Sequence, residues 1–216
     1  MLEKMDEFFA ARVVGYDEHM KRDIKGAKEF YGYTASLLPK KEGAHILDLG
    51  CGTGLELEEY FKLNPEAKIT GIDLSESMLA ELKKKFADKD VSVICGSYFD
   101  EPLGTEKYDS AVSVESLHHF ERSLKLDLYK KLHAALKHDG VFVLTDYFAE
   151  SEALEVEYFE NLKNLKIEQG ISDGEFYHYD TPLTVEHEME VLREAGFSDV
   201  KIMKNWEATF TVLAGK

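Results

Sequence analysis

Between residues 43 and 147, short apolar runs alternate with stretches whose apolar residues recur every three or four positions. The runs predict buried strands and the stretches predict amphipathic helices. We expect strands at residues 45–49, 68–73, 91–95, 108–114 and 141–146. We expect helices at 54–63, from a Ser75 N-cap to Phe86, and from Leu124 to a stop at Asp139-Gly140. Alternation of strand and helix indicates parallel pairing with right-handed crossovers.

The last thirty residues follow a different pattern. Thr184 is expected to cap a helix that carries Val185, Met189 and Leu192 and ends at Gly196. Two strand-like runs follow, 199–205 and 208–213, with only a short segment between them. So short a connection predicts an antiparallel hairpin.

Composition predicts a single soluble α/β domain. The 216 residues are 44% hydrophobic, and 26 Lys and Arg face 42 Asp and Glu, for a net charge of −16. This charge disfavours nucleic acid and anionic membrane surfaces as partners; we interpret the lysines at 83–85 and 40–41 as solvated faces. No apolar stretch approaches the ~20 residues of a membrane span, and no signal peptide is evident, so we expect a cytoplasmic protein. Two cysteines, Cys51 and Cys95, have neither disulfide-framework nor zinc-site spacing.

The most informative motif is Asp-Leu-Gly-Cys-Gly-Thr-Gly at residues 48–54, directly after the first strand. Glycines this closely spaced let the backbone bend sharply and lie bare against a ligand. In an open α/β sheet, ligands bind beyond the carboxyl ends of the strands where strand order reverses, which is where this loop is expected. Asp73 ends the second strand 21 residues after Gly52, the interval at which a carboxylate meets ribose hydroxyls.

A nicotinamide cofactor would use the same scaffold. Its fingerprint places a third small residue where this chain has Leu55. A pyrophosphate binder also has no need of Asp48, whereas an acid there could hold the ammonium group of an amino-acid-bearing cofactor, directly or through water.

The segments 46–54 and 70–75 together resemble the class I S-adenosylmethionine-dependent methyltransferases. The resemblance extends from about residue 43 to 147 and, more loosely, to the end of the chain. It implies a Rossmann-like, doubly wound, seven-stranded sheet, mostly parallel with an antiparallel last strand. It also implies S-adenosyl-L-methionine as the cofactor.

The resemblance further implies roles for individual residues. The loop Gly50, Cys51, Gly52 and Gly54 would cradle the methionine part, Asp73 the ribose, and Leu74 with Met78 the adenine. Gly96, Ser97 and Tyr98 lie where many members have a Gly-Asp pair, and Ser97 replaces its acid. Tyr16, in a segment like the Tyr-Asp cap of small-molecule methyltransferases, is expected to bind the cofactor's carboxylate, and Glu115 to contact the cofactor.

The catalytic residues are expected just after the fourth strand, at Glu115-Ser116-Leu117-His118-His119. His118 could act as a general base and His119 could contact substrate, since histidine titrates near neutrality. Two adjacent histidines are by themselves a poor metal site, so we expect no metal ligation. The Asn/Asp-Pro-Pro-Tyr signature of amide- and amine-directed members is missing here. Tyr147, at the end of the fifth strand, is the other candidate substrate contact.

Around the cofactor-binding core at 43–147 we expect an N-terminal cap at 1–42, a substrate-cap insertion at 148–183 and a C-terminal helix and hairpin at 184–216. The sequence therefore predicts a methyltransferase acting at O, N or S of a small, uncharged or cationic molecule. Alternatives are a nicotinamide-dependent oxidoreductase, a non-catalytic cofactor-binding protein and a tRNA-modifying methyltransferase. The sequence sets neither the acceptor atom nor the oligomeric state.

Overall fold

A seven-stranded sheet forms the centre of the computed structural model, which describes residues 1–172 and 174–216. Its strands are β1 (His45–Leu49), β2 (Lys68–Asp73), β3 (Asp90–Cys95), β4 (Tyr108–Val114), β5 (Leu136–Tyr147), β6 (Asp199–Trp206) and β7 (Thr209–Gly215). They lie in the order β3-β2-β1-β4-β5-β7-β6. The first five pair in parallel, and β7 runs antiparallel to both β5 and β6. The predicted Rossmann-like sheet and its terminal hairpin are confirmed.

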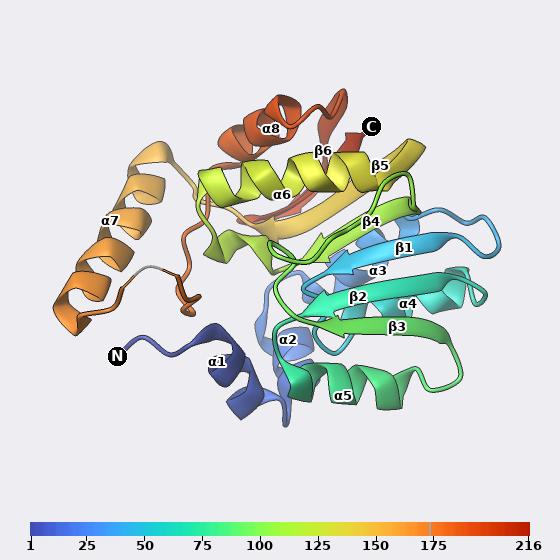
Figure 1. Cartoon of the computed structure of the whole chain (residues 1–216), viewed down its shortest axis with the longest axis horizontal. Helices are drawn as coiled ribbons and strands as arrows, with labels where there is room; N and C mark the ends of the chain where they lie inside the picture. The colour runs from blue at the N-terminus through green and yellow to red at the C-terminus, as the bar shows by residue number, and fades with distance from the viewer. Residues whose placement is uncertain (173) are drawn as a thin grey trace.

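Helices cover both faces of the sheet (Figure 1). They are α1 (Met5–Arg12), α2 (Tyr16–Asp23), α3 (Ala27–Leu37), α4 (Leu55–Leu63), α5 (Glu76–Lys85), α6 (Arg122–Ala135), α7 (Glu152–Gln169) and α8 (Val185–Glu194). Side chains of α3, α4 and α5 form one apolar core, and those of α6 and α8 form most of the helical part of the other. Ser75 and Thr184 accept hydrogen bonds from backbone N–H groups three residues on, as the predicted N-caps of α5 and α8. Among the described residues, no helix combines the length and apolarity needed to cross a bilayer.

The predicted stop of α6 at Asp139-Gly140 is wrong. The helix ends at Ala135, and Leu136 already belongs to β5, where it pairs with Tyr108. Regular pairing resumes only between Ser110 and Val141, so the intervening residues form an irregular stretch within the strand. Leu136 continues the apolar stripe of the helix in sequence, but its side chain is buried as part of the sheet.

Helices α1 and α2 lie beyond the carboxyl ends of β1 to β3 (Figure 1). The residues before α1 pair with the segment that follows α7. Met5 N–H donates to the Phe176 carbonyl and His178 N–H donates to the Glu3 carbonyl. Two segments far apart in sequence are thus joined over the end of the sheet at which a ligand is expected.

Candidate active site

The glycine loop between β1 and α4 has the conformation that its sequence predicts. Gly50, Gly52 and Gly54 all have positive φ, at 74°, 47° and 76°. A Cβ atom on Gly50 would lie 2.0 Å from the Ser116 hydroxyl, whereas one on Gly52 would meet nothing within 4 Å. Glycine at position 50 is therefore required for packing, and at position 52 it leaves bare backbone facing open space.

Asp73 holds this loop against the end of β2. One carboxylate oxygen accepts from the Gly52 N–H at 2.8 Å, and the other accepts from the Ser75 N–H at 2.8 Å. Burial raises the pKa of Asp73, against the lowering effect of these backbone N–H groups. Each oxygen retains a lone pair with which it can accept from a ligand.

A narrow crevice of about 60 Å³ lies along the loop and Asp73. It is lined by Met5, Phe9, Tyr16, Gly50, Gly52, Asp73, Leu74, Met78, Tyr98, Val114, Glu115, Ser116 and His119. Eight residues expected to bind cofactor are among them: Tyr16, Gly50, Gly52, Asp73, Leu74, Met78, Tyr98 and Glu115. Asp48, Cys51, Gly54, Gly96 and Ser97 were expected there as well but do not line it.

Asp48 lies behind the loop as a fully buried carboxyl. Neither of its oxygens has a hydrogen-bond partner within the described residues, and one oxygen of the buried Glu56 is likewise unpartnered. Burial first, and the neighbouring Glu56 carboxyl next, raise the pKa of Asp48. A buried carboxylate is costly unless it is satisfied, either by a proton shared with the Glu56 carboxyl or by a donor from outside the protein.

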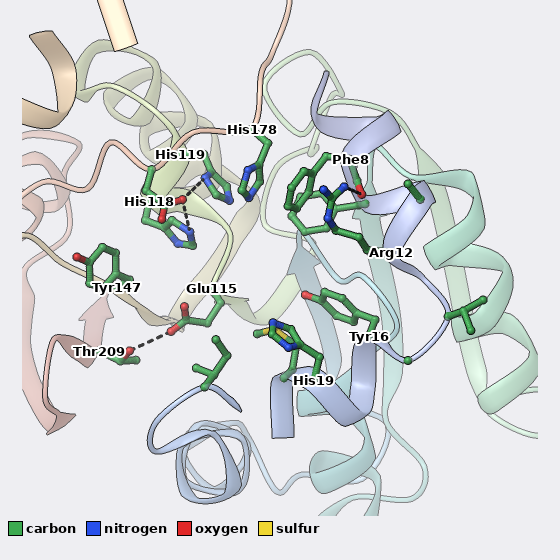
Figure 2. Close-up of a pocket in the computed structure, with 17 residues that line it drawn as sticks. Phe8, Arg12, Tyr16, His19, Glu115, His118, His119, Tyr147, His178 and Thr209 are labelled. Atoms are coloured by element: carbon green, nitrogen blue, oxygen red, sulfur yellow. Dashed lines mark hydrogen bonds and ion pairs between the residues drawn. The ribbon is translucent and has the colours of Figure 1, made fainter. Parts of the chain in front are cut away.

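A larger cavity of about 760 Å³ adjoins the crevice (Figure 2). The two share Phe9, Tyr16, Glu115 and His119 as walls. The rest of its lining comes mainly from the N-terminal cap and from the ends of β4 and β5: Phe8, Ala11, Arg12, Val14, Gly15, His19, Met20, Ile24, His118, Tyr147, His178, Asp180 and Thr209. The three predicted substrate-side residues, His118, His119 and Tyr147, all line this cavity.

His118 forms a buried pair with Asp146, the next-to-last residue of β5. Its Nδ1 lies 2.5 Å from an Asp146 oxygen, and Asp146 also accepts from the N–H groups of Leu117 at 2.8 Å and Tyr147 at 3.0 Å. Burial alone would lower the pKa of His118, but the charge and hydrogen bond of Asp146 outweigh it and raise that pKa to about 9. The imidazole is therefore oriented by a fixed carboxylate.

His119 has a different environment. Its Nδ1 lies 3.2 Å from an oxygen of Asp180, and burial lowers its pKa to about 4. The same Asp180 oxygen lies 3.6 Å from Nε2 of His118. Figure 2 shows the rings of His118, His119 and His178 gathered on one side of the cavity.

Comparisons with known proteins agree with this geometry. Residues 46–140 match the family model described as a methyltransferase domain. The carboxy-S-adenosyl-L-methionine synthase of Nautilia profundicola is 27% identical over this whole chain and 96% of its own length. A malonyl-[acyl-carrier protein] O-methyltransferase of Priestia megaterium is 38% identical, over 47% of this chain and 36% of its own. These matches support a class I S-adenosylmethionine-dependent methyltransferase family for this chain.

Solved structures of family members share the fold. An S-adenosylmethionine-dependent methyltransferase from Aquifex aeolicus superimposes with a TM-score of 0.65 at 18% identity, over 95% of this chain and 97% of its own. Human N-acetylserotonin methyltransferase, in complex with S-adenosylmethionine, gives 0.68 at 18% identity, over 98% of this chain and 56% of its own. The comparisons support S-adenosylmethionine as the cofactor. The bare backbone at Gly52 and the oxygens of Asp48 fit such an amino-acid-bearing molecule.

Sequence reasoning missed two carboxylates of this methyltransferase. Asp146 stands at the carboxyl end of a predicted strand, a position that could have marked it. Asp180 lies outside any helix or strand, 61 residues after His119 in sequence. The position of Asp180 is set by a backbone hydrogen bond from Thr181 N–H to the His118 carbonyl, at 2.8 Å. No local sequence pattern predicts this long-range contact.

Proposed function

We propose that this enzyme transfers the methyl group of S-adenosylmethionine to an O, N or S atom of a small molecule held in the 760 Å³ cavity. The observation that supports this most strongly is the shared wall of Phe9, Tyr16, Glu115 and His119. A cofactor in the crevice would have its sulfonium methyl close to the cavity, where an acceptor can approach from the side opposite sulfur. Such an in-line substitution needs positioning and exclusion of water more than it needs chemistry from side chains.

The cofactor's polar ends have matching groups. We assign the ribose hydroxyls to Asp73 and the methionine part to the backbone of residues 50–54. The ammonium group falls to Asp48, directly or through water, which would satisfy its unpartnered oxygens. Burial raises the pKa of Tyr16, so that its hydroxyl stays a neutral donor suited to a carboxylate.

The adenine belongs, in this proposal, between apolar side chains at the other end of the crevice. Leu74 and Met78 line the crevice there together with Tyr98. Gly96 and Ser97 directly precede Tyr98, and we propose that they also contact the adenine, through the same turn. Cys51 and Gly54 contribute through the shape of the loop, and Glu115, at a positive φ of 50°, is aimed into both spaces.

The charges in the lining of the cavity support a neutral or cationic acceptor. Glu115 and Asp180 place acidic groups on its wall, and the one Arg in its lining, Arg12, is already held by Glu3 at 3.0 Å. A neutral or cationic small molecule suits this wall better than a multiply charged anion does. The net charge of −16 argues in the same direction against tRNA. His118 is the residue we propose to contact the acceptor group, with Tyr147 and His119 beside it.

A second candidate function comes from the full-length similarity to proteins named carboxy-S-adenosyl-L-methionine synthase. Such a product would carry an extra carboxylate on the cofactor. The acidic wall and the neutralised Arg12 make methyl transfer the better-supported candidate. We distinguish the two by the mass of the cofactor product.

The test begins with calorimetric titration of S-adenosylmethionine and of a nicotinamide cofactor into the protein. Binding of the first alone supports the proposal, and binding of the second alone overturns it. Small hydroxyl, thiol and amine acceptors are then screened for formation of the demethylated cofactor together with a methylated acceptor. Recovery of a carboxylated cofactor instead would replace methyl transfer with the second candidate.

A further inference from the structure

We propose that His118, His119 and Asp180 form an open, three-ligand site for a divalent transition metal on the wall of the cavity. Each offers one ligand atom, and these atoms lie within 4.8 Å of one another. All three residues line the cavity, so a bound ion would face the space that receives the acceptor. This is a new site within the protein, separate from the cofactor-binding loop.

The spacing of the ligand atoms suits such an ion. Metal bonds to imidazole nitrogen and carboxylate oxygen of about 2.0–2.2 Å place neighbouring ligand atoms about 3.0–3.5 Å apart. The Asp180 oxygen lies 3.2 Å from His119 Nδ1 and 3.6 Å from His118 Nε2. All three ligand atoms lie within 4.8 Å of one another, so an ion would have to draw them together only slightly.

The backbone holds the three residues together. His118 and His119 lie in a short 3-10 turn, Leu117–His119, with ring centroids 4.0 Å apart. Asp180 is pinned beside them because Thr181 N–H donates to the His118 carbonyl at 2.8 Å. The site therefore does not depend on the chance orientation of one surface side chain.

Asp146 supplies the outer support that metal-binding histidines use. By accepting from His118 Nδ1 at 2.5 Å, it leaves Nε2 as the nitrogen that faces Asp180. A carboxylate behind a ligating imidazole fixes its tautomer and orientation and increases its basicity as a ligand. Asp146 is in turn fixed by the N–H groups of Leu117 and Tyr147.

A second grouping, Glu115 with His118 and Asp146, also brings three ligand atoms together. We favour the grouping with Asp180 because Asp146 already accepts three hydrogen bonds. Glu115 accepts one from the Thr209 hydroxyl at 3.2 Å. The experiment below separates the two groupings.

Two imidazoles and one carboxylate suit Zn²⁺, Fe²⁺ or Co²⁺ better than the hard ions Mg²⁺ and Ca²⁺. Three protein ligands leave positions open for a substrate, as in catalytic rather than structural sites. The role in catalysis rests on the proposed function. An acceptor hydroxyl bound at an open position would lose its proton to water more readily. Its oxygen would then bond to the methyl carbon as the carbon–sulfur bond breaks and its electron pair returns to sulfur.

The test uses untagged, chelator-treated full-length protein, titrated with Zn²⁺ by calorimetry and with Co²⁺ by visible absorption. We expect one equivalent of each metal, and an affinity at least about 100-fold lower in His118→Ala, His119→Ala and Asp180→Asn. Asp146→Asn should lose about 10- to 100-fold. His138→Ala, which removes an exposed histidine 3.1 Å from Asp139, is the matched control and should bind as the wild type does.

The melting temperature of each variant verifies that it is folded. If His119→Ala does not fold, His119→Gln takes its place. Failure of the folded wild type to bind either metal overturns the site. So does binding that survives Asp180→Asn but is abolished by Glu115→Gln. S-Adenosylmethionine is titrated into the same metal-free sample: cofactor binding without metal binding refutes this site alone, whereas metal binding without cofactor binding refutes the proposed function alone.

Discussion

Asp17 in α2 joins the N-terminal cap to the glycine loop and to α5. One of its oxygens accepts a hydrogen bond from the Thr53 hydroxyl at 2.5 Å, and the other lies 2.6 Å from the Lys85 ammonium. Lys85 also contacts Glu58 in α4 at 2.7 Å. The residue before Asp17 is Tyr16, which lines the crevice. These contacts therefore hold α2, which carries Tyr16, against the glycine loop and α5.

Removal of the Asp17 contacts should change the rates of S-adenosylmethionine binding and release more than the affinity of the protein for this cofactor. The crevice, at about 60 Å³, is far smaller than the ~300 Å³ or more of a typical ligand pocket, so we expect α2 to move when S-adenosylmethionine enters. In Asp17→Ala we expect both association and dissociation rate constants to rise, by about three- to tenfold, since charge-assisted contacts contribute ~1 kcal/mol or more. Surface plasmon resonance measures both. Asp23→Ala, an acid at the other end of α2 that pairs with Arg22, should leave them unchanged. Wild-type kinetics in Asp17→Ala would show that the cap is held elsewhere.

Asp73→Ala should weaken S-adenosylmethionine binding at least tenfold. The substitution removes the proposed ribose contact, which is a charge-assisted pair of hydrogen bonds, and it also frees the Gly52 N–H. Asp73→Asn retains one acceptor oxygen and should have intermediate affinity. Isothermal calorimetry gives the three dissociation constants, with Asp90→Ala at the exposed edge of β3 as the control. Equal affinity in wild type and Asp73→Ala would remove the ribose assignment.

The elements of the sheet could be predicted because each strand and helix carries its own period and its own ends. Ser75 and Thr184 marked two helix starts correctly, since a side-chain cap is a local interaction. The boundary between α6 and β5 could not be predicted in the same way. Leu136 fits the helical stripe as well as it fits a strand, and only its pairing with Tyr108, a long-range contact, decides between them.

The two halves of the site differ for the same reason. The glycine loop and Asp73 lie on consecutive strands whose spacing follows from the fold, so their meeting could be foreseen. Asp180 meets His118 and His119 because Thr181 bonds to the His118 carbonyl and because Lys4 bridges to Tyr177. These contacts join segments with no shared periodicity, so local spacing around His118 and His119 does not predict the approach of Asp180.

The stability of the protein should depend on the buried pair Asp48 and Glu56. Burial raises the pKa of both carboxyls. The folded state therefore retains protons that the unfolded chain loses above about pH 4. The contribution of this pair to stability is fully present below about pH 4 and is lost as the pH rises through the folded-state pKa values. In Glu56→Gln we expect an unfolding free energy at pH 7 that is higher by about 1 kcal/mol, with little gain at pH 4. Urea unfolding at both values measures this, with Glu59→Gln on the same helix as the control. A destabilised variant at pH 7 would mean that the Glu56 carboxylate has a cationic partner in solution.

Replacement of His118 should separate cofactor binding from turnover. His118 lines the cavity but not the crevice. The dissociation constant of His118→Ala for S-adenosylmethionine should therefore stay within about twofold of the wild-type value. Loss of an oriented group at the acceptor should lower kcat by about 100-fold or more. Tyr147→Phe is the companion variant, because it keeps the ring and removes a hydroxyl that lies 3.1 Å from that of Tyr158. Once an acceptor is found, steady-state kinetics with each variant and calorimetry on the same samples make the comparison. Full turnover in His118→Ala would point to Glu115, a half-buried carboxyl that lines both the crevice and the cavity.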